Sequence, residues 1–108
     1  MNNIVFTKNN IKIEKSFDNN SKTVYITIHT NKIEELIKLI KNRFDLKCGE
    51  FMGDITGNQF FANCTSGKYK ISIGYGEWFP FAILSDNQDS NQLVEEIFEW
   101  LQTIKIPI

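Results

Sequence analysis

The sequence predicts an α+β domain: a two-layer sandwich in which two helices cover one face of an antiparallel sheet of about five to six strands. Three observations predict this class. A chain of 108 residues is the size of one domain with one core, so residues 1–108 are expected to form a single globular domain. Several short segments alternate apolar and polar residues with a period of two, as strands do. Two longer segments have the helical period of about 3.6 residues, which gives the order ββα(β)βββα.

Strands are expected at the start of the chain. They occupy residues 4–6, 11–17 and 22–30, with a turn at the polar letters DNNS. In the third of these segments Val24, Ile26 and Ile28 alternate with the more polar Tyr25 and Thr27. Alternation of this kind places the aliphatic side chains on one face of a strand, so this part of the chain is expected to form a β-hairpin.

A helix is expected at residues 31–44, where the apolar period changes from two to about 3.6. Its apolar face consists of Ile33, Leu36, Ile37, Ile40 and Phe44. Asn31 and Glu34 have the spacing of a capping box, in which each side chain bonds the backbone N–H at the other position. The first turn of this helix is therefore expected to be capped by Asn31.

The second half of the chain predicts a three-stranded meander and a second helix. Glycines at 49, 53 and 57 predict a loop over residues 45–59, with room for a short strand near 46–52. Strands are expected at residues 60–65, 68–75 and 79–85, and a helix at 90–104 with Asp89 or Ser90 as its cap. The apolar stripe of this helix is Leu93, Ile97, Trp100, Leu101 and Ile104.

Composition and charge exclude several functional classes. A net charge of -1 with 42% hydrophobic residues excludes the composition of a disordered chain. The nine Lys and Arg side chains of residues 1–48 are dispersed among strand and helix faces, so we expect no nucleic-acid partner. No apolar run approaches the roughly 20 residues that cross a bilayer, and the polar start MNNIVFTKNN is unlike a secretory signal. We therefore expect a cytoplasmic protein with no membrane partner.

Residue types suited to catalysis or metal binding form no motif in this chain. Cys48 and Cys64 lack the CxxC spacing of zinc sites and are expected to be reduced, packed thiols rather than a disulfide. An enzyme that uses His29, the single histidine, with one of the cysteines is a less favoured alternative. Another is acid/base or metal chemistry by Glu50 and Asp54, four residues apart in a loop. We expect no catalytic residue, no cofactor and no metal.

The segment GYGEWFPFAIL, residues 74–84, carries rings that either fill the core or contact a partner. Within it Tyr75, Glu77, Trp78 and Phe79 lie beside two glycines and a proline. Rings next to a carboxylate in a connection between strands are typical of binding sites, because loops carry contact residues and Trp and Tyr are enriched at hot spots. The alternative is that Trp78 and Phe79 pack in the core. We place all four residues in a candidate partner-binding surface.

Acidic residues near the C-terminus extend this candidate surface. Residues 77–108 carry six acids against Lys105 alone. The added candidates are Asp86, Asp89, Glu95, Glu96 and Glu99. The three glutamates are expected opposite the apolar stripe of the second helix, and the two aspartates just before its N-terminus, where the helix dipole also favours them. An acidic surface rimmed by rings suits a basic protein partner.

The C-terminal sequence YGEWFPFAILSDNQDSNQLVEEIFEWL resembles small immunity proteins of bacterial contact-dependent growth inhibition and other polymorphic toxin systems, best over residues 69–104. The resemblance implies tight one-to-one binding of a cognate toxin domain, often a nuclease. It also implies that acidic groups meet the basic active-site cleft of the toxin and occlude it without turnover. The alternative is an interaction or structural domain that self-associates as a homodimer, through the uncovered sheet face or an edge strand.

Overall fold

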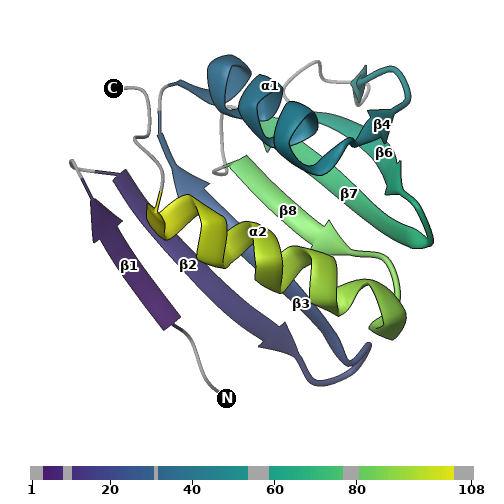
Figure 1. Ribbon diagram of the computed structural model, residues 1–108, viewed down its shortest axis with the longest axis horizontal. Helices are drawn as coiled ribbons and strands as arrows, with labels where there is room; N and C mark the ends of the chain where they lie inside the picture. The colour runs from purple at the N-terminus through teal and green to yellow at the C-terminus, as the bar shows by residue number, and fades with distance from the viewer. Residues whose placement is uncertain (1–3, 9–10, 31, 54–58, 77–80, 104–108) are drawn as a thin grey trace.

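The computed structural model of the chain describes residues 4–8, 11–30, 32–53, 59–76 and 81–103 (Figure 1). Within these residues the strands pair in antiparallel fashion to form one sheet. Two α-helices lie together against one face of this sheet. The predicted two-layer α+β sandwich is therefore confirmed.

Eight strands belong to the sheet in the described part of the chain. They are β1 (Ile4–Lys8), β2 (Ile11–Asp18), β3 (Thr23–His29), β4 (Lys47–Cys48), β5 (Met52–Gly53), β6 (Gln59–Ser66), β7 (Tyr69–Gly76) and β8 (Phe81–Ser85). The helices are α1 (Ile33–Phe44) and α2 (Asn91–Thr103), with a 3₁₀ turn, η1, at Gln88–Ser90. The two-residue strands β4 and β5 lie where the sequence predicts a loop with one short strand. Neither described helix has the length and apolar character that crossing a membrane requires.

The β3–β8 pairing joins the N-terminal strands β1–β3 to the strands of the second half of the chain. The strand order is β1-β2-β3-β8-β7-β6-β4, with β5 also paired to β6, so the last strand in sequence lies in the middle of the sheet. In this pair Ile26 lies opposite Ile83, and Ile28 lies opposite Phe81. All four side chains are fully buried. Burial of side chains of this size stabilises the fold by roughly 1.5–3 kcal/mol each.

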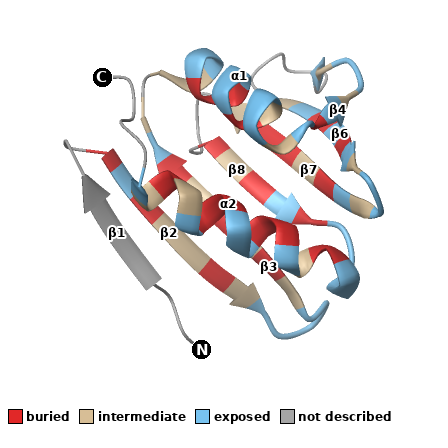
Figure 2. Ribbon diagram, viewed as in Figure 1, coloured by how far each residue is buried: buried red, intermediate tan, exposed pale blue. Residues whose placement is uncertain are grey.

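One core lies between the sheet and the helices. Figure 2 shows buried residues on the strands beneath the helices and on the helix sides that face the sheet. In α1 the buried residues are Leu36, Ile37 and Ile40, which belong to the predicted apolar face. In α2 they are Leu93, Val94, Ile97, Phe98 and Leu101. Phe44 and Trp100 are partly buried against this core. Their rings meet edge to face, with centroids 5.5 Å apart.

The ends of α1 differ from the predicted capping box. The helix begins at Ile33 after Lys32, which makes no side-chain capping bond, and the predicted cap Asn31 lies outside the described residues. The C-terminal end is closed by Asp45 in the left-handed conformation, with φ 52°, and its N–H donates to the Lys41 carbonyl. A left-handed residue of this kind satisfies a carbonyl that the end of a helix leaves unpaired.

The start of α2 also differs from the prediction. The Asn87 side chain accepts a hydrogen bond from the Ser90 N–H at 2.9 Å. The expected cap at Asp89 or Ser90 is therefore wrong. The reason is that Ser90 is fully buried and its hydroxyl accepts the Lys70 N–H of β7 at 2.7 Å, which satisfies a strand rather than the helix.

Asn91, the first residue of α2, holds the helix against the β2–β3 hairpin. Its Oδ1 accepts the Val24 N–H at 3.0 Å, and its Nδ2 donates to the Lys22 carbonyl at 3.0 Å. One carboxamide thus satisfies a donor and an acceptor at the turn end of the hairpin. These two bonds fix where α2 begins relative to β3.

Asn91→Ala is expected to lower the free energy of unfolding by about 1–3 kcal/mol, because it leaves the Val24 N–H without its partner. Gln92→Ala, at an exposed neighbour on the same helix, is the matched control and is expected to cost less than about 0.5 kcal/mol. Urea unfolding followed by circular dichroism measures both variants. Equal stabilities would contradict the role given to Asn91.

The cysteines correct one sequence expectation. Cys48 and Cys64 form a disulfide, with an S–S distance of 2.09 Å, rather than two reduced thiols. They lie directly opposite each other in the β4–β6 pair. Their separation of 16 residues specifies no strand register, so the sequence carries no signal that the two sulfur atoms meet. Disulfides are typical of oxidising compartments, and the compartment of this protein stays a prediction.

Candidate functional site

One predicted acidic residue of α2 is paired within the fold. Glu95 points toward β2, where its Oε1 lies 2.5 Å from Lys15 Nζ. The same ammonium lies 5.2 Å from the centroid of the Phe98 ring. An intramolecular ion pair therefore accounts for the position of Glu95, and its role in partner binding stays a prediction.

Three other predicted acids form a surface that we call the acidic face: Asp89 in η1, and Glu96 and Glu99 in α2. All three are exposed. The sequence of α2 contains no Lys or Arg, and none of the three carboxylates has a hydrogen bond or ion pair with another described residue. Glu96 and Glu99 are three positions apart on the helix, so their side chains are neighbours. The acidic face is thus a local concentration of uncompensated negative charge.

Asp86 is directed toward the opposite side of the sheet. It follows β8 and accepts a hydrogen bond from the Ser72 hydroxyl at 2.7 Å. Ser72 alternates along β7 with Ile71 and Ile73, both fully buried beneath the helices, so its side chain points to the face that no helix covers. Asp86 therefore borders that uncovered face.

Tyr75 packs on the helix side of the sheet. It has the same strand parity as Ile71 and Ile73, and its ring stacks on Phe60 with centroids 5.4 Å apart. The Phe51 ring lies 5.5 Å from the same tyrosine. We call the half-buried rings of Phe51, Phe60 and Tyr75 the aromatic cluster. The predicted contact residues outside the described part of the chain are Glu77, Trp78 and Phe79, whose role stays a prediction.

The sheet face without helices exposes large apolar side chains. Met52, Phe61 and Leu84 are 72%, 44% and 38% exposed. Met52 lies opposite Phe61, and Tyr25 lies opposite Leu84, so these side chains point to the same side of the sheet. We call Tyr25, Met52, Phe61 and Leu84 the open sheet face. The sequence predicted an uncovered sheet face as a possible surface for self-association but did not name its residues. The alternation of Phe61 with the apolar Ala62 and Cys64 is a signal for one of them.

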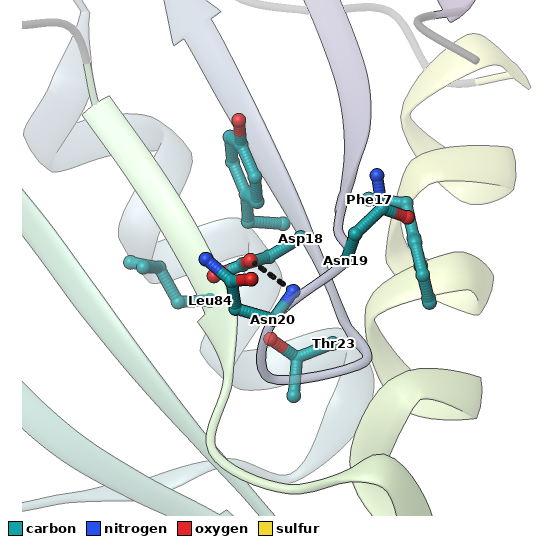
Figure 3. A pocket seen from close by; sticks show the side chains of 7 residues that line it. Phe17, Asp18, Asn19, Asn20, Thr23 and Leu84 are labelled. Atoms are coloured by element: carbon teal, nitrogen blue, oxygen red, sulfur yellow. Dashed lines mark hydrogen bonds between the residues drawn. The ribbon is translucent and has the colours of Figure 1, made fainter. Parts of the chain in front are cut away.

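Two pockets accompany the open sheet face. The first, of about 570 Å³, lies at the β2–β3 hairpin between Asp18, Asn20, Thr23, Tyr25 and Leu84 (Figure 3). The second, of about 440 Å³, is lined by Gly49, Glu50, Met52, Phe61, Ala62 and Asn63. Both volumes lie within the range of small-molecule sites, about 300–1,000 Å³. Carboxylate, carboxamide and apolar groups line them, and no lysine or arginine does.

The hairpin pocket contains a carboxylate that the turn keeps ionised. The Asn20 N–H donates to Asp18 Oδ1 at 2.9 Å, the bond drawn in Figure 3. This bond lowers the pKa of Asp18 below its ordinary value, and the Ser21 side chain adds to the effect. The resulting stabilisation is present above the unfolded-state pKa of Asp18 and is lost as pH falls through the lower folded-state pKa.

A pH titration of the Asp18 carboxyl carbon by NMR is therefore expected to give a midpoint below that of the unfolded chain. Ser21→Ala is expected to raise this midpoint only partway, because the larger effect comes from the Asn20 backbone. A midpoint of Asp18 at or above its unfolded value would contradict the hydrogen-bonded turn.

Phe61 covers a glycine on the neighbouring strand. Gly74 lies opposite it, and a Cβ built on this glycine would lie 2.8 Å from Phe61 Cδ1. No real Cβ tolerates that distance, so the ring occupies the space that any larger residue would need. Aromatic side chains stabilise strand glycines in this way by covering their exposed backbone.

Gly74→Ala is expected to cost about 1–3 kcal/mol of stability, because the Phe61 ring must move to admit the methyl group. In a Phe61→Ala background the same substitution is expected to cost much less. A double-mutant cycle by urea unfolding measures the coupling. Additive effects would show that the ring and the glycine do not interact.

The described residues do not bring together the groups that either catalytic alternative, His29 with a cysteine or Glu50 with Asp54, requires. His29 is exposed at the end of β3, and both cysteines are bonded to each other, so neither supplies a free thiol. The His29–cysteine enzyme therefore lacks its nucleophile in this state. Glu50 is exposed, and its predicted partner Asp54 lies outside the described residues. Among the described ranges, no three His, Cys, Asp or Glu side chains gather as a metal site would require.

Comparison with protein-family models, with curated proteins and with solved structures found no match. The function is therefore argued from the surfaces of this chain: the acidic face on the helix layer and the open sheet face opposite it.

Proposed function

We propose that this chain is a protein-binding inhibitor of the immunity type, which neutralises a cognate toxin domain by occluding its active site. The acidic face carries this proposal. Asp89, Glu96 and Glu99 are all exposed, and none of them forms an ion pair with a described residue. A basic cleft, such as the substrate-binding cleft of a nuclease, is complementary to this charge.

The electrostatics of α2 favour a partner that brings positive charge. Like charges on neighbouring helix positions cost a few tenths of a kcal/mol, so Glu96 and Glu99 slightly destabilise the isolated helix. A docked lysine or arginine reverses this cost and also steers the encounter. Glu95 differs from both, because Lys15 already neutralises it.

The aromatic cluster and residues 77–79 supply the second half of the proposed surface. Tyr75 is the penultimate residue of β7, two positions before this segment, and its ring is half-buried against Phe51 and Phe60. The cluster thus lies next in sequence to Glu77, Trp78 and Phe79, which are outside the described residues. Aromatic side chains are typical of binding hot spots, because they bury a large area at low entropic cost.

The charge-reversal pair Glu96→Lys and Glu99→Lys is expected to weaken binding of the cognate protein at least about tenfold, because like charges then face each other. The matched control is Glu34→Lys with Glu35→Lys, two exposed acids on α1 that carry the same change of charge. The partner is recovered from native lysate with the tagged chain, and both variants are then compared by biolayer interferometry. Circular dichroism verifies that each variant folds.

Equal loss in the α1 control would show that net charge, and not the acidic face, determines binding. A partner retained at full affinity by the α2 variant would contradict the proposed surface directly.

The open sheet face favours a second candidate function, self-association without catalysis. Met52 and Leu84 are large, exposed and on one side of the sheet, where a second copy would bury them. In this case sedimentation velocity is expected to detect a dimer at micromolar concentration, and Met52→Glu with Leu84→Glu is expected to dissociate it. A strict monomer across that range excludes this candidate.

A further inference from the structure

The segment that follows α1 crosses the outer edge of the sheet and is attached there by few backbone bonds. We call residues 45–53 the strap. Its attachments to β6 are the two-residue strands β4 and β5 and one hydrogen bond between them, from the Gly49 N–H to the Asn63 carbonyl at 3.0 Å. Figure 1 shows β4 at the margin of the sheet beside β6. Short pairings of this kind open locally at low cost.

Side-chain packing holds the two ends of the strap more than its middle. Leu46 is buried at the start, and Phe51 packs against Tyr75 with ring centroids 5.5 Å apart. Gly49 and Glu50 are exposed, and Met52 is the most exposed large apolar side chain of the described residues. The Cys48–Cys64 bond links the half-buried Cys48 of the strap covalently to the buried Cys64 of β6.

We propose that the Cys48–Cys64 disulfide is a redox-sensitive clasp whose reduction detaches the strap from β6 while the rest of the sandwich stays folded. The sheet does not need the strap, because β6 remains paired with β7 along its whole length, from Gln59 to Ser66. Detachment frees the Phe51 ring from the aromatic cluster and exposes the Asn63 carbonyl at the sheet edge. The chain then has a clasped state in oxidising surroundings and an open state in reducing ones.

A dithiol reductant supplies the two thiolate attacks that the chemistry requires. Its first thiolate attacks the sulfur of Cys48, which is half-buried, whereas Cys64 is only 1% exposed. The S–S bond breaks, and Cys64 leaves as a thiolate that takes up a proton. The second thiol of the reductant then attacks the mixed disulfide and releases the Cys48 thiol. Two electrons and two protons have passed to the protein, and the reductant has become a disulfide.

The test compares hydrogen exchange of the full-length chain before and after reduction with dithiothreitol, read by mass spectrometry. Amides of residues 47–53 are expected to exchange at least about tenfold faster after reduction, because loss of the cross-link increases the conformational entropy of the detached strap and so lowers the free energy that local opening requires. Residues 11–29, in the β2–β3 hairpin, are the internal control and are expected to change less than about twofold.

Cys48→Ser, without any reductant, is expected to reproduce the fast exchange at 47–53. Ser66→Ala, which also removes a contact between β6 and the end of α1, is the matched control with the clasp intact. Unchanged exchange in the strap after verified reduction would overturn the proposal. Equal acceleration of exchange in residues 11–29 would also overturn it, because that result indicates global unfolding. Alkylation of both cysteines by iodoacetamide in denatured, unreduced protein would overturn it as well, because it shows that the disulfide is absent.

Discussion

The pairing of β3 with β8 is the interaction on which the rest of the structure depends. It brings the last strand of the chain into the middle of the sheet, between the N-terminal strands and the meander of β6 and β7. Fully buried isoleucines and Phe81 form this contact. Because β8 also leads into η1 and α2, its position places the second helix over the same sheet face as α1. The helix layer, the open sheet face and the edge position of the strap all follow from this one non-local pairing.

Hydrogen bonds around η1 fix the position of α2 relative to the sheet. The Ser90 hydroxyl accepts the Lys70 N–H near the start of β7, and the Asn91 side chain accepts the Val24 N–H near the start of β3. Two neighbouring side chains thus connect α2 to strands from both halves of the sheet. The exposed carboxylates that follow them are therefore held on a rigid element, as a docking surface requires.

Local patterns predicted the elements well, because periodicity depends on neighbours in sequence. Both helices, the apolar face of α1 and the long strands were predictable from spacing alone. The predicted stripe of α2 contained Leu93, Ile97 and Leu101 but not the buried Val94 and Phe98. The cap of α2 was not predictable, since Ser90 is recruited by a distant strand, whereas the predicted cap Asn31 of α1 lies outside the described residues. The disulfide and the β3–β8 register were not predictable either, because they depend on which strands become neighbours.

The candidate site was predictable only in part. The acidity of α2 is visible in the sequence, but the pairing of Glu95 with Lys15 needs the position of β2. Tyr75 shares the parity of Ile71 and Ile73, so its inward direction was readable from β7 once the strand was recognised. The exposure of Phe61 and Leu84 required knowing which face the helices leave uncovered. The role of residues 77–79 is independent of all these observations and stays a prediction.

The most direct test of the central claim is the dissociation constant between this chain and the cognate protein that it recovers from native lysate. It is measured by calorimetry across ionic strengths from about 0.05 to 0.5 M, where screening of exposed charges becomes strong. The account predicts a one-to-one complex whose affinity falls steadily as salt rises. An affinity that does not change with salt, or no complex at all, would contradict it.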